Sequence, residues 1–146
     1  MLYLDTSCLA KIYLDEPGAG AFVAWLAGKT GLVCAHHGRL ELVAALKRNH
    51  RESRITAAEL RDLLRQLADD ERSGLIRWLP LGASLIESAC QQTAALPPSV
   101  FIRAGDALHL ACAGDAGLKE IYSHDRHLLA AAPHFGLKGR DVITGA

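Results

Sequence analysis

Short apolar runs alternate with longer segments of helical periodicity along this chain, and that alternation limits the possible folds more than any other feature. The strand-like runs lie at residues 1–4, 31–36, 76–81, 120–123 and near 142–144. Helical patterns connect them and cover approximately residues 9–13, 19–26, 39–48, 56–67, 84–96, 106–113 and 126–132. Strands that alternate with helices form parallel sheets with helices on both faces. The sequence therefore predicts an α/β fold, with functional groups at the carboxyl ends of its strands.

Two local signals mark the ends of predicted elements. Thr56 and Glu59 form a capping box at the start of one helix, because the pattern T-A-A-E pairs each side chain with the backbone N–H of the other residue. Pro80 lies within the third strand-like run. Because proline lacks a backbone N–H, this strand is expected to end there or to lie near an edge of the sheet.

The composition is that of an ordinary folded domain. The chain has 146 residues, of which 50% are hydrophobic and 22% charged, and we expect a single domain over residues 1–146. Lys and Arg together number 16, as do Asp and Glu, so the formal net charge is zero. This balance argues against binding of duplex nucleic acid through bulk charge, although it leaves room for a local basic groove.

Neither the N-terminus nor any apolar run indicates a membrane protein. No apolar run reaches the roughly 20 residues of a membrane span, and Asp5 interrupts the first apolar run. The cysteines are widely spaced in apolar contexts, which favours reduced thiols in the core, at Cys8, Cys34, Cys90 and Cys112. We therefore expect a cytoplasmic protein without a membrane partner.

Four acidic residues occupy positions that simple solvent exposure does not explain. Asp5 follows the apolar run MLYL, and Asp125 ends the run EIYSHD. Glu41 lies within the apolar helical pattern RLELVAAL, and Asp106 heads the similarly apolar segment DALHLACA. The other acids lie among polar or turn residues and are expected to be solvated, namely Asp15, Glu16, Glu52, Glu59, Asp62, Asp69, Asp70, Glu71, Glu87, Asp115, Glu120 and Asp141.

Each of these four positions also has an explanation without catalysis. Asp5, Asp106 and Asp125 each precede a helical pattern, where a carboxylate can accept hydrogen bonds from the free N–H groups of the first turn. Glu41 can keep its carboxylate in solvent or pair with Arg39. If all four converge, however, their like charges persist in a shared pocket only with bound protons or cations. Oxygen ligands without His or Cys favour Mg²⁺ or Mn²⁺.

The segments around these acids resemble the four acidic motifs of PIN-domain ribonucleases, and more narrowly those of the VapC toxins of type II toxin–antitoxin systems. The motifs are LDTS at Asp5, LELVAAL at Glu41, RAGDALHLACA at Asp106 and YSHDRHLL at Asp125. Their order and spacing match over nearly the full chain. The resemblance implies a three-layer α/β/α sandwich around a mostly parallel five-stranded sheet.

The same resemblance implies an activity and a set of site residues. Catalysis and ligation of Mg²⁺ or Mn²⁺ would fall to Asp5, Glu41, Asp106 and Asp125. The hydroxyl group of Thr6 or Ser7 would help to position them. The chain would be an endoribonuclease toxin in which metal-activated water hydrolyses an RNA phosphodiester bond. Four ionised acids permit two metal ions without establishing a second one.

Partners follow from the resemblance as well. Transfer RNA and ribosomal RNA are both reasonable substrates, a small VapB-like antitoxin would inhibit the enzyme, and homodimers are common in the family. Arg103 and Arg126 flank the third and fourth motifs and are the preferred candidates for contacts with phosphate. A second group of cations follows the second motif and comprises Arg39, Lys47, Arg48, Arg51 and Arg54. Solvated helix ends and surface pairs are the better explanation for Lys47, Arg51 and Arg54 taken singly.

Three histidines lie close to the acidic motifs. His109 is one turn beyond Asp106 on an apolar segment, so we expect it in the core or next to the acidic site. His124 and His127 flank Asp125 and could meet RNA, although histidines are also common in exposed loops.

Other functions remain open from the residues alone. A zinc site could use C-A-H at 34–36 or H-x-x-C at 109–112, but no CxxC or HxxxH motif accompanies them. A haloacid-dehalogenase-like phosphatase would need an aspartate two residues after Asp5, where Ser7 stands, and a response-regulator receiver would need one at the end of IRWLPLG. The alternative from another class is a non-catalytic RNA- or protein-binding module with the PIN fold.

Overall fold

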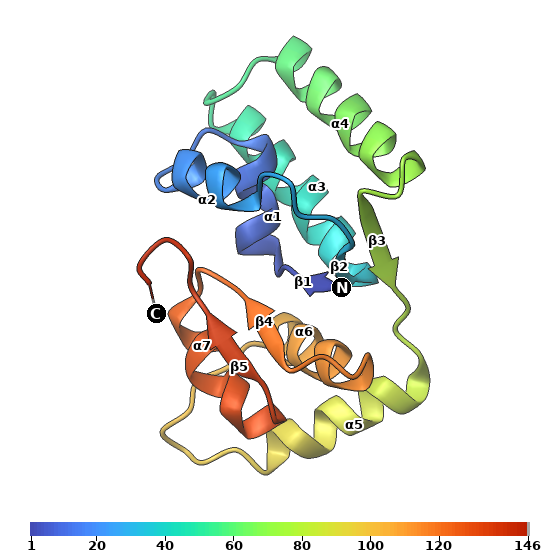
Figure 1. The fold of residues 1–146 in the computed structure, drawn as a ribbon, viewed down its shortest axis with the longest axis vertical. Helices are drawn as coiled ribbons and strands as arrows, with labels where there is room; N and C mark the ends of the chain where they lie inside the picture. The colour runs from blue at the N-terminus through green and yellow to red at the C-terminus, as the bar shows by residue number, and fades with distance from the viewer. Residues whose placement is uncertain (146) are drawn as a thin grey trace.

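Five short strands lie at the centre of the protein, whose computed structural model describes residues 1–145 (Figure 1). They are β1 (Leu2–Tyr3), β2 (Leu32–Ala35), β3 (Ile76–Leu79), β4 (Glu120–Tyr122) and β5 (Lys138–Arg140). β1, β2 and β3 form one parallel sheet in that order, and β4 pairs with β5 in parallel. A single parallel bridge from Leu4 to Tyr122 connects these two parts, which gives the order β3-β2-β1-β4-β5. The predicted parallel arrangement of five strands is confirmed, with a division into three and two.

The weak join between β1 and β4 follows from the early end of β1. The backbone N–H of Asp5 still donates to the carbonyl of Tyr122 at 3.0 Å. Helix α1 begins at the next residue, Thr6, so the chain leaves the sheet after one bridge. This abrupt change from strand to helix holds Asp5 at the carboxyl edge of the sheet.

Helices cover both faces of the strands. Among residues 1–145 they are α1 (Thr6–Tyr13), α2 (Ala19–Leu26), α3 (His36–Arg51), α4 (Ala57–Arg72), α5 (Ala83–Ala94), α6 (Ala104–Asp115), α7 (Arg126–Ala131) and the 3₁₀-helix η1 (Ala132–Phe135). Leu32 and Cys34 of β2 pack into an apolar cluster with α1 to α4, while Val33 and Ala35 pack into a second cluster with α5, α6 and α7. This alternation along one strand confirms the predicted three layers.

Helix α3 is longer than the sequence pattern predicted. It starts at His36, directly after β2, rather than at Arg39, and it continues to Arg51. Its polar first turn hides the start of the helix from a search for apolar periodicity. The early start brings His37 and Glu41 to the carboxyl end of β2.

The predicted strand near residues 142–144 is wrong. β5 is Lys138–Arg140, which carries no apolar side chain, and residues 142–144 form a turn. Asp141 begins this turn, because its Oδ1 accepts the backbone N–H groups of Ile143 (2.9 Å) and Thr144 (3.3 Å). The expectation that Asp141 is solvated is also wrong, since it is 5% exposed and its Oδ2 lies 2.8 Å from His124 Nδ1.

The two predicted element ends are confirmed. Thr56 Oγ1 accepts the backbone N–H of Glu59 at 3.1 Å, and the Glu59 carboxylate accepts that of Thr56 at 2.6 Å. β3 ends one residue before Pro80 and lies at an edge of the three-stranded sheet. None of the described helices has the length and apolarity that a membrane span requires.

Candidate metal centre

Asp5 lies at the carboxyl end of β1 and caps α1. Its Oδ1 accepts the backbone N–H of Cys8 at 3.0 Å and the hydroxyl of Ser7 at 2.7 Å, and its Oδ2 accepts the hydroxyl of Ser123 at 2.6 Å. The interpretation of Asp5 as a helix cap is therefore right, but the residue is also only 3% exposed. Burial raises the pKa of Asp5 despite the opposing effects of His109 and these hydrogen bonds.

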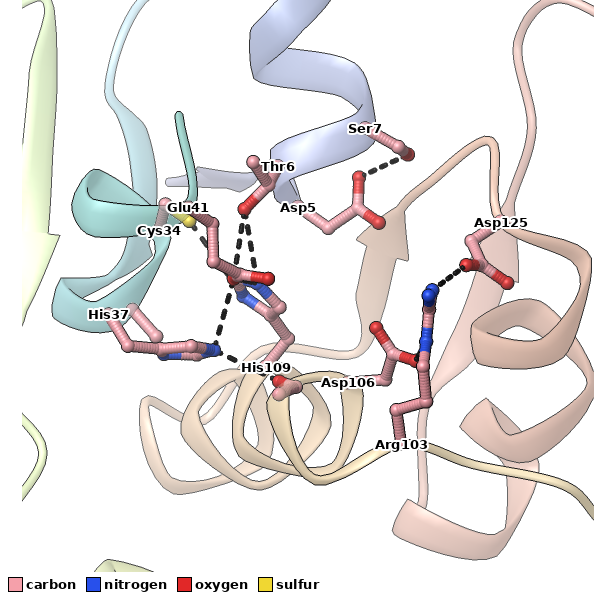
Figure 2. A network of polar contacts seen from close by, with 12 residues as sticks. Asp5, Thr6, Ser7, Cys34, His37, Glu41, Arg103, Asp106, His109 and Asp125 are labelled. Atoms are coloured by element: carbon pink, nitrogen blue, oxygen red, sulfur yellow. Dashed lines mark hydrogen bonds and ion pairs between the residues drawn. The ribbon is translucent and has the colours of Figure 1, made fainter. Parts of the chain in front are cut away.

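Glu41 is held by a side chain from each neighbouring helix. Its Oε1 accepts the Thr6 hydroxyl of α1 at 3.1 Å and lies 2.7 Å from Nε2 of His109 on α6 (Figure 2). Arg39 pairs with Glu71 instead, so the predicted alternative partner does not hold Glu41. Burial acts to raise the pKa of Glu41, but the hydrogen bond and charge of His109, with help from other neighbours, outweigh it and leave that pKa lowered.

His109 is itself fixed from behind by a buried tyrosine. The Tyr3 hydroxyl accepts the backbone N–H of Ala35 at 3.0 Å, which leaves its proton free for His109 Nδ1 at 2.9 Å. This arrangement favours the tautomer whose Nε2–H donates to Glu41. Gly38 permits the close packing, because a Cβ there would lie 2.5 Å from Cys34 Sγ and 3.1 Å from His109 Cε1. The expectation of His109 in the core next to the acids is confirmed.

The other two acids share one arginine. Asp106 is the third residue of α6, whose N-cap is Arg103, so the interpretation of Asp106 as a cap is wrong. Its Oδ2 accepts a hydrogen bond from Nε of Arg103 at 3.2 Å. Asp125 does cap its helix, since its Oδ1 accepts the N–H of His127 at 2.7 Å, and its Oδ2 accepts Arg103 Nη2 at 2.8 Å. The Arg103 side chain remains 65% exposed.

All four acids open onto one cavity of about 650 Å³. Thr6, Ser7, Arg103 and His109 also line it. The structure therefore brings together seven of the eight residues that the sequence singled out, namely Asp5, Glu41, Asp106, Asp125, Thr6, Ser7 and Arg103. Arg126 is exposed and is not among the lining residues, so its role as a substrate contact stays a prediction.

Comparison with known families agrees with this arrangement. The PIN domain, as a family, matches residues 2–133. The chain belongs to the PIN domain family. No curated protein matches the sequence significantly.

Solved structures share the fold of this PIN domain at low sequence identity. VapC20 of Mycobacterium tuberculosis, described as a toxin that cleaves the sarcin–ricin loop, is 20% identical with a TM-score of 0.70, over 90% of this chain and 95% of its own. FitAcB of Neisseria gonorrhoeae is 16% identical with a TM-score of 0.69, over 97% and 98%. FitAB bound to a DNA fragment is 15% identical with a TM-score of 0.62, over 97% and 95%. At these identities the likeness shows a common fold.

The donor atoms of the acidic cavity fit a hydrated divalent cation. All are carboxylate oxygens, and among residues 1–145 neither Glu41 Oε2 nor Asp106 Oδ1 has a hydrogen-bond partner. No three of the four carboxylates in the described chain have oxygens within 4.8 Å of one another. The PIN domain therefore does not present a closed ligand cage there. Mg²⁺ suits such a site, because it commonly retains several waters and uses one or two carboxylates.

Sequence patterns missed three polar residues of this site. Ser123 links two motifs, because its hydroxyl donates to Asp5 and accepts the backbone N–H of Asp125 at 2.9 Å. Tyr3 was assigned only to a strand, and its hydroxyl reaches His109 through the core. His37 lies one turn before Glu41, with 3.3 Å between its Nε2 and Glu41 Oε1. The spacing of His37 and Glu41 was the one available signal, and it depended on extending α3 to His36.

The zinc sites considered from sequence are not formed as suggested. Cys34 is buried at the end of β2, whereas His36 is exposed at the start of α3. The only group of three His, Cys, Asp or Glu side chains with ligand atoms within 4.8 Å in the described residues is His37, Glu41 and His109.

Proposed function

We propose that this protein is a Mg²⁺- or Mn²⁺-dependent endoribonuclease that acts as the toxin of a toxin–antitoxin pair. The observation that carries the proposal is the convergence of Asp5, Glu41, Asp106 and Asp125 on one cavity of a PIN domain. They arrive from four separate segments, so local sequence alone does not account for the cluster. Of the arginines that line the cavity in the described chain, Arg103 is the one paired with any of these four carboxylates, which leaves them a negative charge that a divalent cation would compensate.

The residues of the cavity would have distinct tasks in hydrolysis. A bound cation would lower the pKa of an attacking water and neutralise charge on the phosphate. Ser7 and Ser123 hold the Asp5 carboxylate in place, and Thr6 and His109 hold that of Glu41. Asp106 presents an oxygen without a hydrogen-bond partner among the described residues. Rigid support of this kind favours catalysis because the charges need little rearrangement during reaction.

Arg103 would change partners when substrate binds. It now bridges Asp106 and Asp125, but its side chain is 65% exposed and long enough to rotate. A cation at the carboxylates would take over its role there. The guanidinium could then bind a phosphate of the RNA, for which its paired N–H groups are well suited.

A second set of arginines supports an extended path for RNA. The cavity continues from the acids along α3 to Arg48, Arg51 and Arg54, all of them exposed. Arg39 and Lys47 do not line it, and Arg39 is paired with Glu71. We propose that this arginine strip binds the RNA backbone, which gives a local basic groove on a chain of zero net charge.

The classes of RNA and partner that we propose come from the family and its structural neighbours. VapC20 is described as cleaving the sarcin–ricin loop, so ribosomal RNA is the first substrate to test here, with transfer RNA second. We also propose a VapB-like antitoxin, a homodimeric state and a cytoplasmic location. Co-expression tests the toxin role: the protein alone should arrest growth, and a neighbouring antitoxin should relieve the arrest.

The decisive assay for the activity is cleavage of ribosomal and transfer RNA by purified full-length protein. We expect cleavage with Mg²⁺ or Mn²⁺, none with chelator, and a loss of at least about 100-fold in Asp5→Asn, from several kcal/mol of lost stabilisation. Asp62→Asn is the matched control, because Asp62 on α4 is 72% exposed and outside the cavity. Equal cleavage by wild type and Asp5→Asn would contradict the proposal. RNA binding without cleavage by both would favour the non-catalytic module.

A further inference from the structure

We propose that His37, Glu41 and His109 form a second metal site, which binds Zn²⁺ or a similar transition-metal ion rather than Mg²⁺. This site shares Glu41 with the acidic cavity but has a different chemistry. Zn²⁺ binding there does not depend on RNA cleavage, so the inference stands apart from the proposed function.

The three side chains come from two helices, α3 and α6. His37 and Glu41 are four residues apart on α3, which places them one above the other on the same face. His109 reaches them from α6, and its ring centroid is 4.2 Å from that of His37. Glu41 Oε1 lies 3.3 Å from His37 Nε2 and 2.7 Å from His109 Nε2. Figure 2 shows the two rings and the carboxylate directed toward one another.

The types of ligand atom decide which metal fits. Two imidazole nitrogens and one carboxylate are a common ligand set for zinc and other transition metals, with a fourth position left for water. Mg²⁺ prefers oxygen ligands and is the poorer match. The oxygens of the acidic cavity are spread more widely, whereas this group already lies within 4.8 Å. The structure thus separates a compact site with nitrogen ligands from an open site with oxygen ligands.

His109 has the supporting contact that metal-bound histidines usually have. A ligating histidine normally donates its other N–H to a fixed oxygen, which sets the ring orientation. His109 Nδ1 lies 2.9 Å from the Tyr3 hydroxyl, which is anchored by the backbone N–H of Ala35. When Nε2 binds a cation, Nδ1 can donate its proton to this hydroxyl. A second neighbour, the Thr6 hydroxyl, lies 3.3 Å from Nε2.

Metal binding would replace two existing interactions. The 2.7 Å contact between His109 Nε2 and Glu41 Oε1 requires a shared proton, and a cation would displace that proton. His37 Nε2 also lies 2.9 Å from the carbonyl of Gly105, and this hydrogen bond would be exchanged for a metal bond. Zn²⁺ binding would therefore move the proton of the neutral His109 ring from Nε2 to Nδ1, where the Tyr3 hydroxyl can accept it.

Occupancy would also restrain Glu41. Its Oε1 faces the two histidines, whereas Oε2 has no hydrogen-bond partner among residues 1–145. A Zn²⁺ ion on Oε1 would hold the carboxylate toward α6. The Glu41 carboxylate would then be less available as a ligand of a Mg²⁺ ion in the acidic cavity. Zn²⁺ should consequently inhibit RNA cleavage, and this consequence alone rests on the proposed function.

The test is calorimetric titration of the full-length protein with Zn²⁺ in excess Mg²⁺. The protein carries Asp106→Asn, which weakens cation binding in the acidic cavity and so limits competition from that site. We expect one Zn²⁺ per chain, and a Co²⁺-loaded sample with the visible absorption of a site containing nitrogen ligands. His37→Gln should weaken Zn²⁺ binding at least about 10-fold, since even supporting residues of metal sites contribute that much. His36→Gln should leave it unchanged, because His36 is adjacent in sequence but exposed.

The same titration can overturn the inference. Absence of Zn²⁺ binding to the parent protein, or equal binding by the His36→Gln and His37→Gln variants, would contradict it. Glu41→Gln is a second variant with the same expected loss, and thermal unfolding of each variant separates lost binding from lost fold. Zn²⁺ binding, together with no RNA cleavage by the Zn²⁺-free wild type in Mg²⁺ or Mn²⁺, would refute the proposed function and leave this site intact. RNA cleavage by the Zn²⁺-free wild type without any Zn²⁺ binding would do the reverse.

Discussion

The two sides of the acidic cavity are built differently. On the anchored side, Asp5 and Glu41 are held by hydroxyl groups and by His109, which is itself fixed through Tyr3. On the arginine side, Asp106 and Asp125 share the exposed Arg103. The first set of contacts orients the carboxylates, and the second compensates their charge with a group that can leave.

This difference indicates how one cavity can be both stable and receptive to a cation. A buried carboxylate needs hydrogen bonds to remain ordered, and neutral hydroxyls supply them without cancelling its charge. An exposed ion pair contributes little to stability, typically below about 1 kcal/mol, so Arg103 can be displaced at small cost. The anchored side thus fixes geometry while the arginine side remains exchangeable.

Of the changes that test this difference between the two sides, Gly38→Ala should have the largest effect on stability, because it disrupts the packing of the anchored side. The new Cβ would lie 2.5 Å from Cys34 Sγ, in a place where little can move. We expect a loss of about 1–3 kcal/mol in the free energy of unfolding, the usual cost of overpacking, measured by urea unfolding. Gly20→Ala on α2 is the control, because no atom lies within 4 Å of the added Cβ. A Gly38→Ala protein as stable as the Gly20→Ala protein would refute close packing behind Glu41.

The pH dependence of stability should distinguish the two anchored acids. Burial raises the pKa of Asp5, so the folded protein holds this proton more tightly than the unfolded chain does. Asp5 therefore stabilises the fold below its unfolded pKa of about 3.9, and this stabilisation is lost as the pH rises through the folded value. The pKa of Glu41 is lowered, so its contribution is present above about pH 4.3 and is lost on acidification.

Unfolding in chelator over a pH series measures this contrast. The stability of wild type relative to Asp5→Asn should fall with rising pH, and that relative to Glu41→Gln should rise across the acidic range. The same trend for both variants would show that the two carboxylates are in equivalent environments, contrary to the structure.

The smallest effect on stability should come from replacing Arg103, the arginine that pairs with Asp106 and Asp125. Arg103→Gln should change stability by less than about 1 kcal/mol, while the Mg²⁺ concentration needed for half-maximal stabilisation falls by about 2- to 5-fold because a competing cation is gone. Arg126→Gln is a matched control, since Arg126 is exposed and outside the cavity lining. An unchanged Mg²⁺ midpoint in Arg103→Gln would show that the guanidinium does not compete with cations.

The fold was largely predictable because burial leaves periodic traces in sequence. β2 is apolar on both faces, and the helix around His109 is apolar almost all round, so both stood out. β5 did not, because an edge strand of sequence Lys-Gly-Arg has no apolar side to detect. Asp141 was missed for the same reason: its burial depends on a turn and on His124, which no periodicity reports.

The acids of the site were predictable for a different reason. Asp5, Glu41, Asp106 and Asp125 are polar residues at positions where the local pattern favours apolar ones or helix caps, and that conflict is visible in the sequence. Supporting residues create no such conflict. Tyr3 fits a strand and Ser123 a strand end. The role of Tyr3 emerges only when β1 meets β2 and α6, and that of Ser123 only when β1 meets β4. Sequence thus revealed the charges and, through the resemblance, the hydroxyls of Thr6 and Ser7, but not the contacts of Tyr3 and Ser123.

The most direct test of the account is Mg²⁺-dependent stability, because it measures whether the converging carboxylates form a cation site. In urea unfolding, wild type should gain about 1.4 kcal/mol at a Mg²⁺ concentration ten times the dissociation constant. Asp62→Asn should behave like wild type, and Asp106→Asn should lose most of this gain. Equal gains in wild type and Asp106→Asn, or no gain in wild type at any Mg²⁺ concentration, would contradict the assignment of this cavity as a metal centre.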